Sequence, residues 1–315
     1  MSPSASNLES NNKLCRALVS RRQNMALQDD LNEAMIHHKN TESLAINNTF
    51  IRRMLTLLGL KTTARFFERD GICVPISKHK IVKSGIWAHL TEAATMKYLA
   101  ENTSLPVPKI HCSFVHKGRA YIVMERIQGD VLPKAWGEKS EESRQNIFAQ
   151  LRSMLEELRA LQPSPNTGVE SCVRGSLFDS RIPRKESRFG PFKTIQEFHL
   201  YLRKNSNPSE IKHMEIAQDL EDLKDMAVKQ DGPWPPPVFT HGDLNPFNIL
   251  VRGEKVVGLI DWEFSGWYPH YWEYTSAWCG NILRTEWRDL LHKFLDPLPE
   301  ELKMEITRQK WWGEF

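Results

Sequence analysis

The segment 241–261 constrains the possible folds of this chain more than any other part of the sequence. It begins with a polar loop, His-Gly-Asp-Leu-Asn-Pro-Phe-Asn, and continues into two apolar runs, residues 248–252 and 255–261. The runs are rich in Val, Ile and Leu, and Gly253-Glu254 separates them, which is the pattern of a β-hairpin. A short hairpin places the start of its first strand beside the end of its second strand. We therefore expect the polar residues at these two ends to lie close together.

Three oxygen-bearing side chains lie at these ends: Asp243, Asn248 and Asp261. Transfer of a phosphoryl group to a hydroxyl requires a carboxylate that orients the hydroxyl and accepts its proton. It also requires a few carboxylate or amide oxygens that hold Mg²⁺ across the phosphates. The three residues supply both, so the segment predicts a phosphoryl-transfer centre. A His-Gly-Asp sequence alone is usually only a turn, but the strand and the second Asp that follow favour the functional interpretation.

The first half of the chain contains a matching cation. Lys83 ends the strand-like run Ile-Val-Lys, and Glu92 follows nine residues later in the helix-favouring segment 89–102. Glu92 shares its helical stripe with apolar residues, so it should face the interior, where an unpaired carboxylate is costly. We therefore expect Lys83 and Glu92 to form an ion pair that holds the lysine near nucleotide phosphates. The alternative is that both lie on the surface.

Over this region the sequence resembles a known superfamily. The stretch from Thr240 through Gly266, and the sequence Trp-Glu-Tyr at 272–274, are similar to the catalytic and metal-binding segments of the aminoglycoside phosphotransferase and choline kinase superfamily, in particular to small-molecule kinases of filamentous fungi. The resemblance extends from about Lys78 to about Gly280. It implies a two-lobed protein-kinase-like fold, with a small β-rich N-terminal lobe and a larger, mainly helical C-terminal lobe.

This resemblance also implies roles for individual residues. Asp243 would be the catalytic base, with His241 beside it among the catalytic groups. Asn248 and Asp261 would be Mg²⁺ ligands, and Glu263 would support them. The implied reaction is Mg²⁺-dependent transfer of the γ-phosphate of ATP to a hydroxyl of a small molecule, whose identity the sequence does not reveal.

Residues 124–127 resemble the hinge between the lobes of such a fold. Backbone groups of Glu125 and Ile127 would bond the adenine, and Met124 would pack behind it. The phosphate loop is the poorest match: the sequence contains neither Gly-x-Gly-x-x-Gly nor Gly-x-x-x-x-Gly-Lys, and the candidate loop, 70–78, has one glycine. This departure leaves a second interpretation open, a catalytically weak or inactive relative that binds nucleotide or a partner.

The order of the predicted elements is strand-rich, then helical, without regular βαβ alternation, which indicates an α+β fold. At one domain per ~150 residues, the chain of 315 residues is long enough for two lobes. We expect a polar extension over residues 1–45 that is partly disordered or helical, a nucleotide-binding lobe over 46–126, and a catalytic and acceptor-binding lobe over 127–315.

Composition excludes several other classes of protein. The 42 basic and 39 acidic residues leave a formal charge of +3, too weak a field for general binding to nucleic acid or to an anionic membrane. The polar N-terminus and the short apolar runs argue against a signal peptide or a transmembrane helix, and five scattered cysteines fit reduced thiols. We therefore expect a soluble cytoplasmic enzyme whose partner is a small-molecule acceptor.

Two further features have more than one interpretation. Eight of the ten tryptophans follow residue 230 and mostly indicate a packed core, although Trp267 and Trp272 are close enough to Asp261 in sequence to reach an acceptor site. The segment 174–204 has eight Lys or Arg against three acidic residues, and is either a charged surface insertion or a site for an anionic acceptor.

A protein kinase is disfavoured, because no long activation segment follows Asp261.

Overall fold

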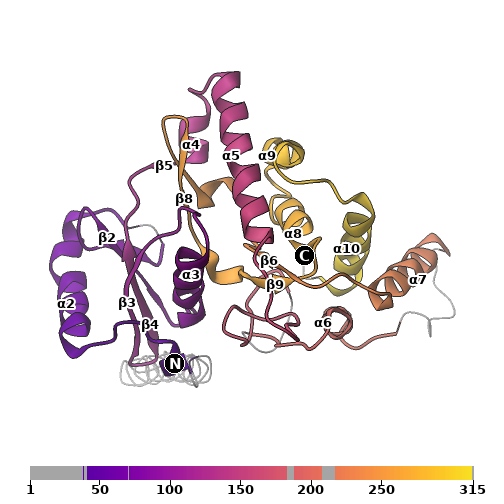
Figure 1. Cartoon of the computed structure of the whole chain (residues 1–315), viewed down its shortest axis with the longest axis horizontal. Helices are drawn as coiled ribbons and strands as arrows, with labels where there is room; N and C mark the ends of the chain where they lie inside the picture. Colours follow the sequence, from indigo (N-terminus) through magenta and orange to yellow (C-terminus); the bar gives the residue numbers. More distant parts are fainter. Residues whose placement is uncertain (1–37, 39–40, 70, 183–187, 208–216, 314–315) are drawn as a thin grey trace, which may run out of the picture.

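The computed structural model describes residues 38, 41–69, 71–182, 188–207 and 217–313. They form a small lobe around one β-sheet and a larger lobe made mainly of helices, which lie side by side in Figure 1. The expected α+β fold is therefore confirmed. Most of the predicted N-terminal extension lies outside the described residues. Within the described ranges, no helix is both long enough and apolar enough to cross a membrane.

The small lobe contains a four-stranded antiparallel sheet in the order β1-β2-β4-β3. Its strands are β1 (Cys73–Pro75), β2 (Lys80–Gly85), β3 (Ile110–His116) and β4 (Arg119–Glu125). Lys83 on β2 lies opposite Cys73 on one side and Ile122 on the other. The lysine is therefore anchored by paired strands on both of its flanks.

Helices cover the two faces of this sheet (Figure 1). α3 (Leu90–Asn102) buries Leu, Ala and Met side chains in one core together with Ile122 of β4. α2 (Phe50–Lys61) lies over the other face, where Leu60 packs beside Val123. Because successive residues of a strand point to opposite faces, β4 contributes to both cores. The inner stripe of α3 also carries Glu92 into the interior.

Helices and short connections make up most of the larger lobe. They are α4 (Leu132–Trp136), α5 (Glu141–Arg159), α6 (Ile195–Leu202), α7 (Ala217–Asp231), α8 (Trp272–Gly280), α9 (Thr285–Leu290) and α10 (Pro299–Trp312). The longest of these helices, α5, begins after Ser140, whose hydroxyl accepts a hydrogen bond from the Ser143 N–H. Its buried stripe includes Ile147, Leu151 and Leu155, so it forms a central support of this lobe.

Two small sheets hold the segment that contains the polar loop. β7 (Ile249–Arg252) and β8 (Lys255–Leu259) form the predicted hairpin, to which β5 (Asp130–Val131) adds a third strand. β6 (Val238–Thr240) pairs with β9 (Gly266–Tyr268), a contact that the sequence does not predict. The polar loop follows β6, and the turn after the hairpin leads into β9, so this pairing holds the two ends of the segment together.

The candidate phosphate loop is not one continuous loop. Its centre, Cys73–Pro75, pairs in register with β2 as a strand. The turn that remains, residues 76–79, lies at the hinge, where the Arg126 N–H donates to the His79 carbonyl oxygen at 3.0 Å. The prediction of a glycine-poor loop across this whole region is therefore wrong, because strand pairing takes up its middle.

The two tryptophans behind the hairpin belong to the core. Trp267 and Trp272 are 5% and 3% exposed. The Trp267 ring meets Phe239 edge-on, with ring centroids 5.1 Å apart, and Trp272 stacks on Tyr268 at 5.4 Å. Core packing explains both residues, and the alternative that they line an acceptor site is wrong.

Candidate active site

The ammonium group of Lys83 lies among three carboxylates that come from both lobes. Its Nζ is 2.9 Å from Glu92 Oε2, 2.6 Å from Asp261 Oδ1 and 3.0 Å from Glu263 Oε2. Glu92 belongs to α3, whereas Asp261 and Glu263 follow β8 in the larger lobe. The expected ion pair between Lys83 and Glu92 is present, and two carboxylates of the larger lobe join it.

Burial and charge act in opposite directions on this cluster. The side chains of Lys83 and Glu92 are almost fully buried, whereas those of Asp261 and Glu263 are 38% and 29% exposed. Burial disfavours the ammonium ion, but the three carboxylates outweigh burial and hold the pKa of Lys83 well above its usual value. Burial raises the pKa of Glu92 to about 7, although Lys83 opposes the rise. Burial likewise raises the pKa of Glu263. One cation thus faces several carboxylates, an arrangement that can accept further positive charge.

Asp261 has an unusual backbone conformation. Its φ and ψ are both 65°, in the left-handed region that residues other than glycine rarely adopt. The Ile260 N–H donates to the Asn248 carbonyl oxygen at 3.0 Å, so the hairpin closes one residue before Asp261. The change of backbone direction takes Asp261 out of the hydrogen-bond ladder of β7 and β8. Its carboxylate forms the ion pair with Lys83.

Two asparagine amides hold the Asp243 carboxylate on one side. Asn245 Nδ2 and Asn248 Nδ2 each donate to Oδ2 at 2.9 Å, and Asn248 Nδ2 also donates to the Asp243 carbonyl oxygen at 2.9 Å. Among the described residues, none donates a hydrogen bond to Oδ1 of Asp243 or to Oδ1 of Asn248. The clamp therefore leaves one oxygen on each of these two residues for a ligand.

The imidazole ring of His241 forms hydrogen bonds with backbone groups of the site. Its Nε2 donates to the Ile260 carbonyl oxygen at 3.0 Å, and its Nδ1 accepts the Asp243 N–H at 3.2 Å. The ring is buried, with its centroid 4.4 Å from that of Trp262. Both ring nitrogens are thus occupied by backbone groups. The geometry places His241 behind the loop as a support, not as a group that can reach a substrate.

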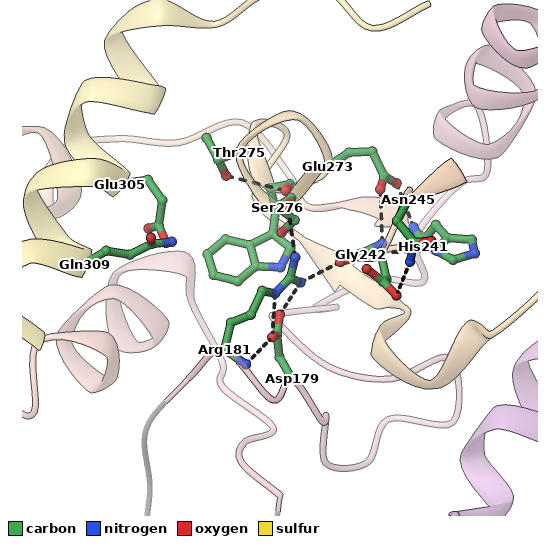
Figure 2. Close-up of polar contacts among 12 residues, drawn as sticks. Asp179, Arg181, His241, Gly242, Asn245, Glu273, Thr275, Ser276, Glu305 and Gln309 are labelled. Carbon is green, nitrogen blue, oxygen red and sulfur yellow. Dashed lines mark hydrogen bonds and ion pairs between the residues drawn. The ribbon is translucent and has the colours of Figure 1, made fainter. Parts of the chain in front are cut away.

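Glu273, at the start of α8, holds the peptide groups of the same loop (Figure 2). Its Oε2 accepts the His241 N–H at 2.7 Å, and its Oε1 accepts the Gly242 N–H at 3.0 Å. Gly242 has a φ of +82°, and a Cβ there would lie 2.8 Å from the Phe264 carbonyl oxygen, so only glycine fits. A carboxylate in the first turn of a helix is also favoured by the helix dipole.

Arg181 holds the loop from the opposite side (Figure 2). Its Nη2 donates to the Gly242 carbonyl oxygen at 2.5 Å, and its Nη1 donates to that of Ser276 at 2.9 Å. Its Nε and Nη2 bind both carboxylate oxygens of Asp179, at 2.8 and 2.6 Å. Asp179 is completely buried, and the guanidinium lies 5.3 Å from the ring centroid of Phe264. Arg181 thus joins the loop, α8 and the turn after β8 into one unit.

The charge environment of Arg181 follows from its position beside Asp179 and the loop. Burial lowers its pKa, but the Asp179 carboxylate outweighs burial and raises the pKa above its usual value, and the charge of Asp243 contributes to the rise. Arg181 lies in the basic segment 174–204, for which the sequence allows a surface insertion or an acceptor site. Neither alternative describes Arg181, because its hydrogen bonds are to interior groups of the protein.

Sequence reasoning missed four residues of this site: Asn245, Glu273, Asp179 and Arg181. Asn245 and Glu273 lie within the stretches that carry the family resemblance, but nothing in the motif indicates what they hold. Asp179 and Arg181 lie in a loop-rich segment, and only their spacing of two residues hints at a pair. Their partners are backbone carbonyls far away in sequence, which a sequence pattern does not reveal.

The predicted hinge connects the lobes at the end of β4. Met124 is 8% exposed and belongs to the core that the two lobes share. The Glu125 N–H donates to the Lys109 carbonyl oxygen at 2.9 Å, whereas the Ile127 N–H has no partner among the described residues. The hinge therefore presents one buried apolar side chain and one unpaired backbone donor.

The combination of a β-rich lobe with a lysine–glutamate pair and a helical lobe with this polar loop is the protein-kinase-like fold of the aminoglycoside phosphotransferases. A thermostable mutant of aminoglycoside phosphotransferase APH(4)-Ia, in complex with AMP-PNP and hygromycin B, is similar with a TM-score of 0.53 and 12% identity, over 77% of this chain and 82% of that chain. The streptomycin–ATP complex of APH(2")-IIa has a TM-score of 0.48 and 13% identity, over 83% and 87%. Macrolide 2'-phosphotransferase MphH from Brachybacterium faecium has a TM-score of 0.40 and 15% identity, over 73% and 74%.

Comparison with protein families gives the same class. The model of the phosphotransferase enzyme family, APH, matches residues 89–303, more than two thirds of the chain. The chain therefore belongs to the phosphotransferase enzyme family. No curated protein matches the sequence.

Proposed function

We propose that this protein is an ATP- and Mg²⁺-dependent kinase that transfers the γ-phosphate to a hydroxyl of a small molecule. The observation that carries the proposal is the clamp on Asp243, whose Oδ2 is held by two asparagine amides while Oδ1 is left for a ligand. A carboxylate fixed in this way is suited to orient a hydroxyl and to accept its proton as the oxygen attacks the γ-phosphorus. Membership of the phosphotransferase enzyme family supports this reaction.

The cluster around Lys83 supports an ATP site. Lys83, held by Glu92, would neutralise charge on the α- and β-phosphates of the nucleotide. Asp261 and Glu263 are partly exposed, so they can release Lys83 when phosphate oxygens take their place. When the nucleotide binds, the Lys83 ammonium would then exchange carboxylate oxygens for phosphate oxygens, and this exchange would contribute to the binding free energy.

The donor set also fits Mg²⁺, which prefers a few carboxylate or amide oxygens. Asp261 offers its carboxylate, and Asn248 offers Oδ1, because its Nδ2 is turned toward Asp243. When bound, the ion would neutralise charge on the phosphates. Asn248 would thus hold both the metal and the base, so the two groups would keep a fixed spacing.

The hinge supports the orientation of the nucleotide. The Ile127 N–H and the Glu125 carbonyl would bond the adenine, with Met124 behind the ring. This assignment gives the nucleotide-binding lobe residues 46–126 and the catalytic and acceptor-binding lobe residues 127–315. His241 would act on the reaction only through the backbone that it holds.

Replacement of Asp243 tests the proposal. Asp243→Asn keeps the shape of the side chain but removes the base, so we expect ATP and Mg²⁺ to raise the melting temperature as in the wild type. Phosphate transfer should fall by about a hundredfold or more. Asp225→Asn, at an exposed position of α7, is the matched control and should change neither quantity. Transfer at the wild-type rate by Asp243→Asn would show that the mechanism is wrong.

The inactive-relative interpretation predicts a different result. In that case the wild-type protein would bind ATP but transfer phosphate to no hydroxyl compound in a broad panel. The glycine-free turn at 76–79 is the feature that favours this alternative.

A further inference from the structure

We propose that the acceptor is a largely apolar hydroxyl compound without positive charge, and that it binds in a pocket between α4, the polar loop and α9. This inference rests on the proposed function and names its substrate class. The pocket has a volume of about 440 Å³, within the range typical of small-molecule sites.

The pocket shares a turn of the chain with the proposed base. Pro246 and Phe247 line it, and they lie between Asn245 and Asn248, the two residues that clamp Asp243. The Asn245 side chain also accepts the Phe247 N–H at 2.9 Å, which fixes this turn. A compound that fills the pocket would therefore be held by the same short turn that orients Asp243, and we expect its hydroxyl end to extend from the pocket toward that carboxylate.

Aromatic and aliphatic side chains make up most of the wall. Trp136 and Trp287 both line the pocket, with their rings 6.4 Å apart and nearly perpendicular. The Trp287 Nε1–H donates to the Leu244 carbonyl oxygen at 3.3 Å, which ties α9 to the polar loop. These are not Trp267 and Trp272, the two tryptophans that the sequence suggests for an acceptor site. The wall instead combines Trp136 of α4 with Trp287 of α9.

The charge of the pocket selects against a polycation. Among its lining residues, all in the described part of the chain, the charged ones are Arg284 and Glu286, one of each sign. A compound with several ammonium groups needs several carboxylates near it, because each unpaired buried charge is costly. The Arg284 guanidinium lies 5.2 Å from the ring centroid of Phe247. This cation at the rim favours a neutral or anionic acceptor.

The rim of the pocket also exposes apolar surface that a ligand would cover. Leu283, in the turn before α9, is 93% exposed, and Phe247 is 47% exposed. Both residues line the same pocket as Arg284. Exposed apolar side chains that gather at one concave site indicate a binding surface, whereas scattered ones do not. The rim thus adds apolar contact on the solvent side of the acceptor.

The dye 8-anilinonaphthalene-1-sulfonate, which is apolar and anionic, can probe the pocket directly in the full-length protein. We expect Leu283→Asp and Arg284→Glu each to weaken binding of the dye at this site on the order of tenfold. Leu55→Asp is the matched control, because Leu55 is an exposed apolar residue of α2, in the small lobe, and does not line the pocket. Estradiol, an uncharged and largely apolar diol, should displace the dye, and gentamicin should not.

Two results would overturn the inference: displacement of the dye by gentamicin with no displacement by estradiol, or equal weakening in Leu55→Asp and Leu283→Asp. Stabilisation by ATP and Mg²⁺, measured on the same preparations, separates this test from that of the proposed function. A protein that binds ATP and transfers phosphate only to polycations contradicts the acceptor class alone. A protein that ATP does not stabilise contradicts the kinase proposal itself.

Discussion

Lys83 and Arg181 are two cations that hold the candidate site together, and they are bound in different ways. The partners of Lys83 are three carboxylate side chains, two of which are more than a quarter exposed. The partners of Arg181 are two backbone carbonyls and the completely buried carboxylate of Asp179. Exposed carboxylates can exchange partners when a ligand arrives, whereas backbone carbonyls cannot do so unless the loop itself moves.

The difference separates two tasks that a phosphotransferase must perform. In the proposed function, Lys83 would change partners, from carboxylates to phosphates, and so contribute to nucleotide affinity. Arg181 is suited to keep its partners, and so to preserve the geometry around Asp243. Variants of the two cations should therefore differ in which kinetic quantity they change.

The largest effect is expected for Lys83→Met. Removal of the ammonium leaves Glu92 buried without a cation, and loss of one partner of a buried pair costs about 3–5 kcal/mol. ATP should no longer raise the melting temperature, and transfer should fall at least a hundredfold. The double variant with Glu92→Gln should regain much of the stability but not the ATP binding. Recovery of ATP binding in the double variant would contradict the role of Lys83.

A smaller and different effect is expected for Arg181→Lys. The charge is kept, but the bidentate hydrogen bond to Asp179 and the simultaneous hydrogen bonds to two backbone carbonyls are lost. We expect kcat to fall roughly tenfold to a hundredfold, with little change in the dissociation constant of ATP. Arg152→Lys, at a half-exposed residue paired with Asp296, serves as the control. An equal loss in ATP affinity and kcat would remove the distinction between the two cations.

Glu263→Gln should have a modest effect that sharpens the account of Lys83. The substitution neutralises a carboxylate that, in the proposed ATP site, would lie near the phosphates, so repulsion of the nucleotide should decrease. In the absence of Mg²⁺, we expect ATP to bind a few-fold more tightly to the variant than to the wild type. The change corresponds to the roughly 1 kcal/mol of an interaction between partly exposed charges. Calorimetric titration with and without Mg²⁺ measures this. A large loss of affinity in both conditions would mean that Glu263 holds the nucleotide directly.

The smallest effect concerns pH. Burial raises the pKa of Glu92 from 4.5 to about 7, so the folded protein binds this proton more tightly than the unfolded chain does. The contribution of Glu92 to stability is therefore greatest below about pH 4.5 and decreases as the pH rises to about 7. Glu92→Gln should flatten this part of the pH profile by a few degrees in melting temperature. Melting curves at pH 5 and pH 8 test it, and an unchanged profile would contradict the shift.

Sequence reasoning predicted the parts of this molecule that local patterns determine. The hairpin that carries Asn248 and Asp261, the strand of Lys83 and the inward face of Glu92 follow from residue type and periodicity. The pairing of β6 with β9 and the contacts of Arg181 do not, because they join segments distant in sequence through backbone groups. A motif gives proximity to the base but not the partners of the two ring nitrogens, so the sequence groups His241 with the catalytic residues, whereas in the structure both nitrogens bond to the backbone.

The most direct test of the account is transfer of label from [γ-³²P]ATP in an extract of small metabolites, with Mg²⁺ and with the protein removed afterwards by filtration. If the protein is a small-molecule kinase, the wild type should produce a labelled compound that Asp243→Asn does not produce, while ATP stabilises both proteins. If ATP stabilises the wild type but no small molecule gains label, or if both proteins produce the same labelled compound, the central claim is contradicted.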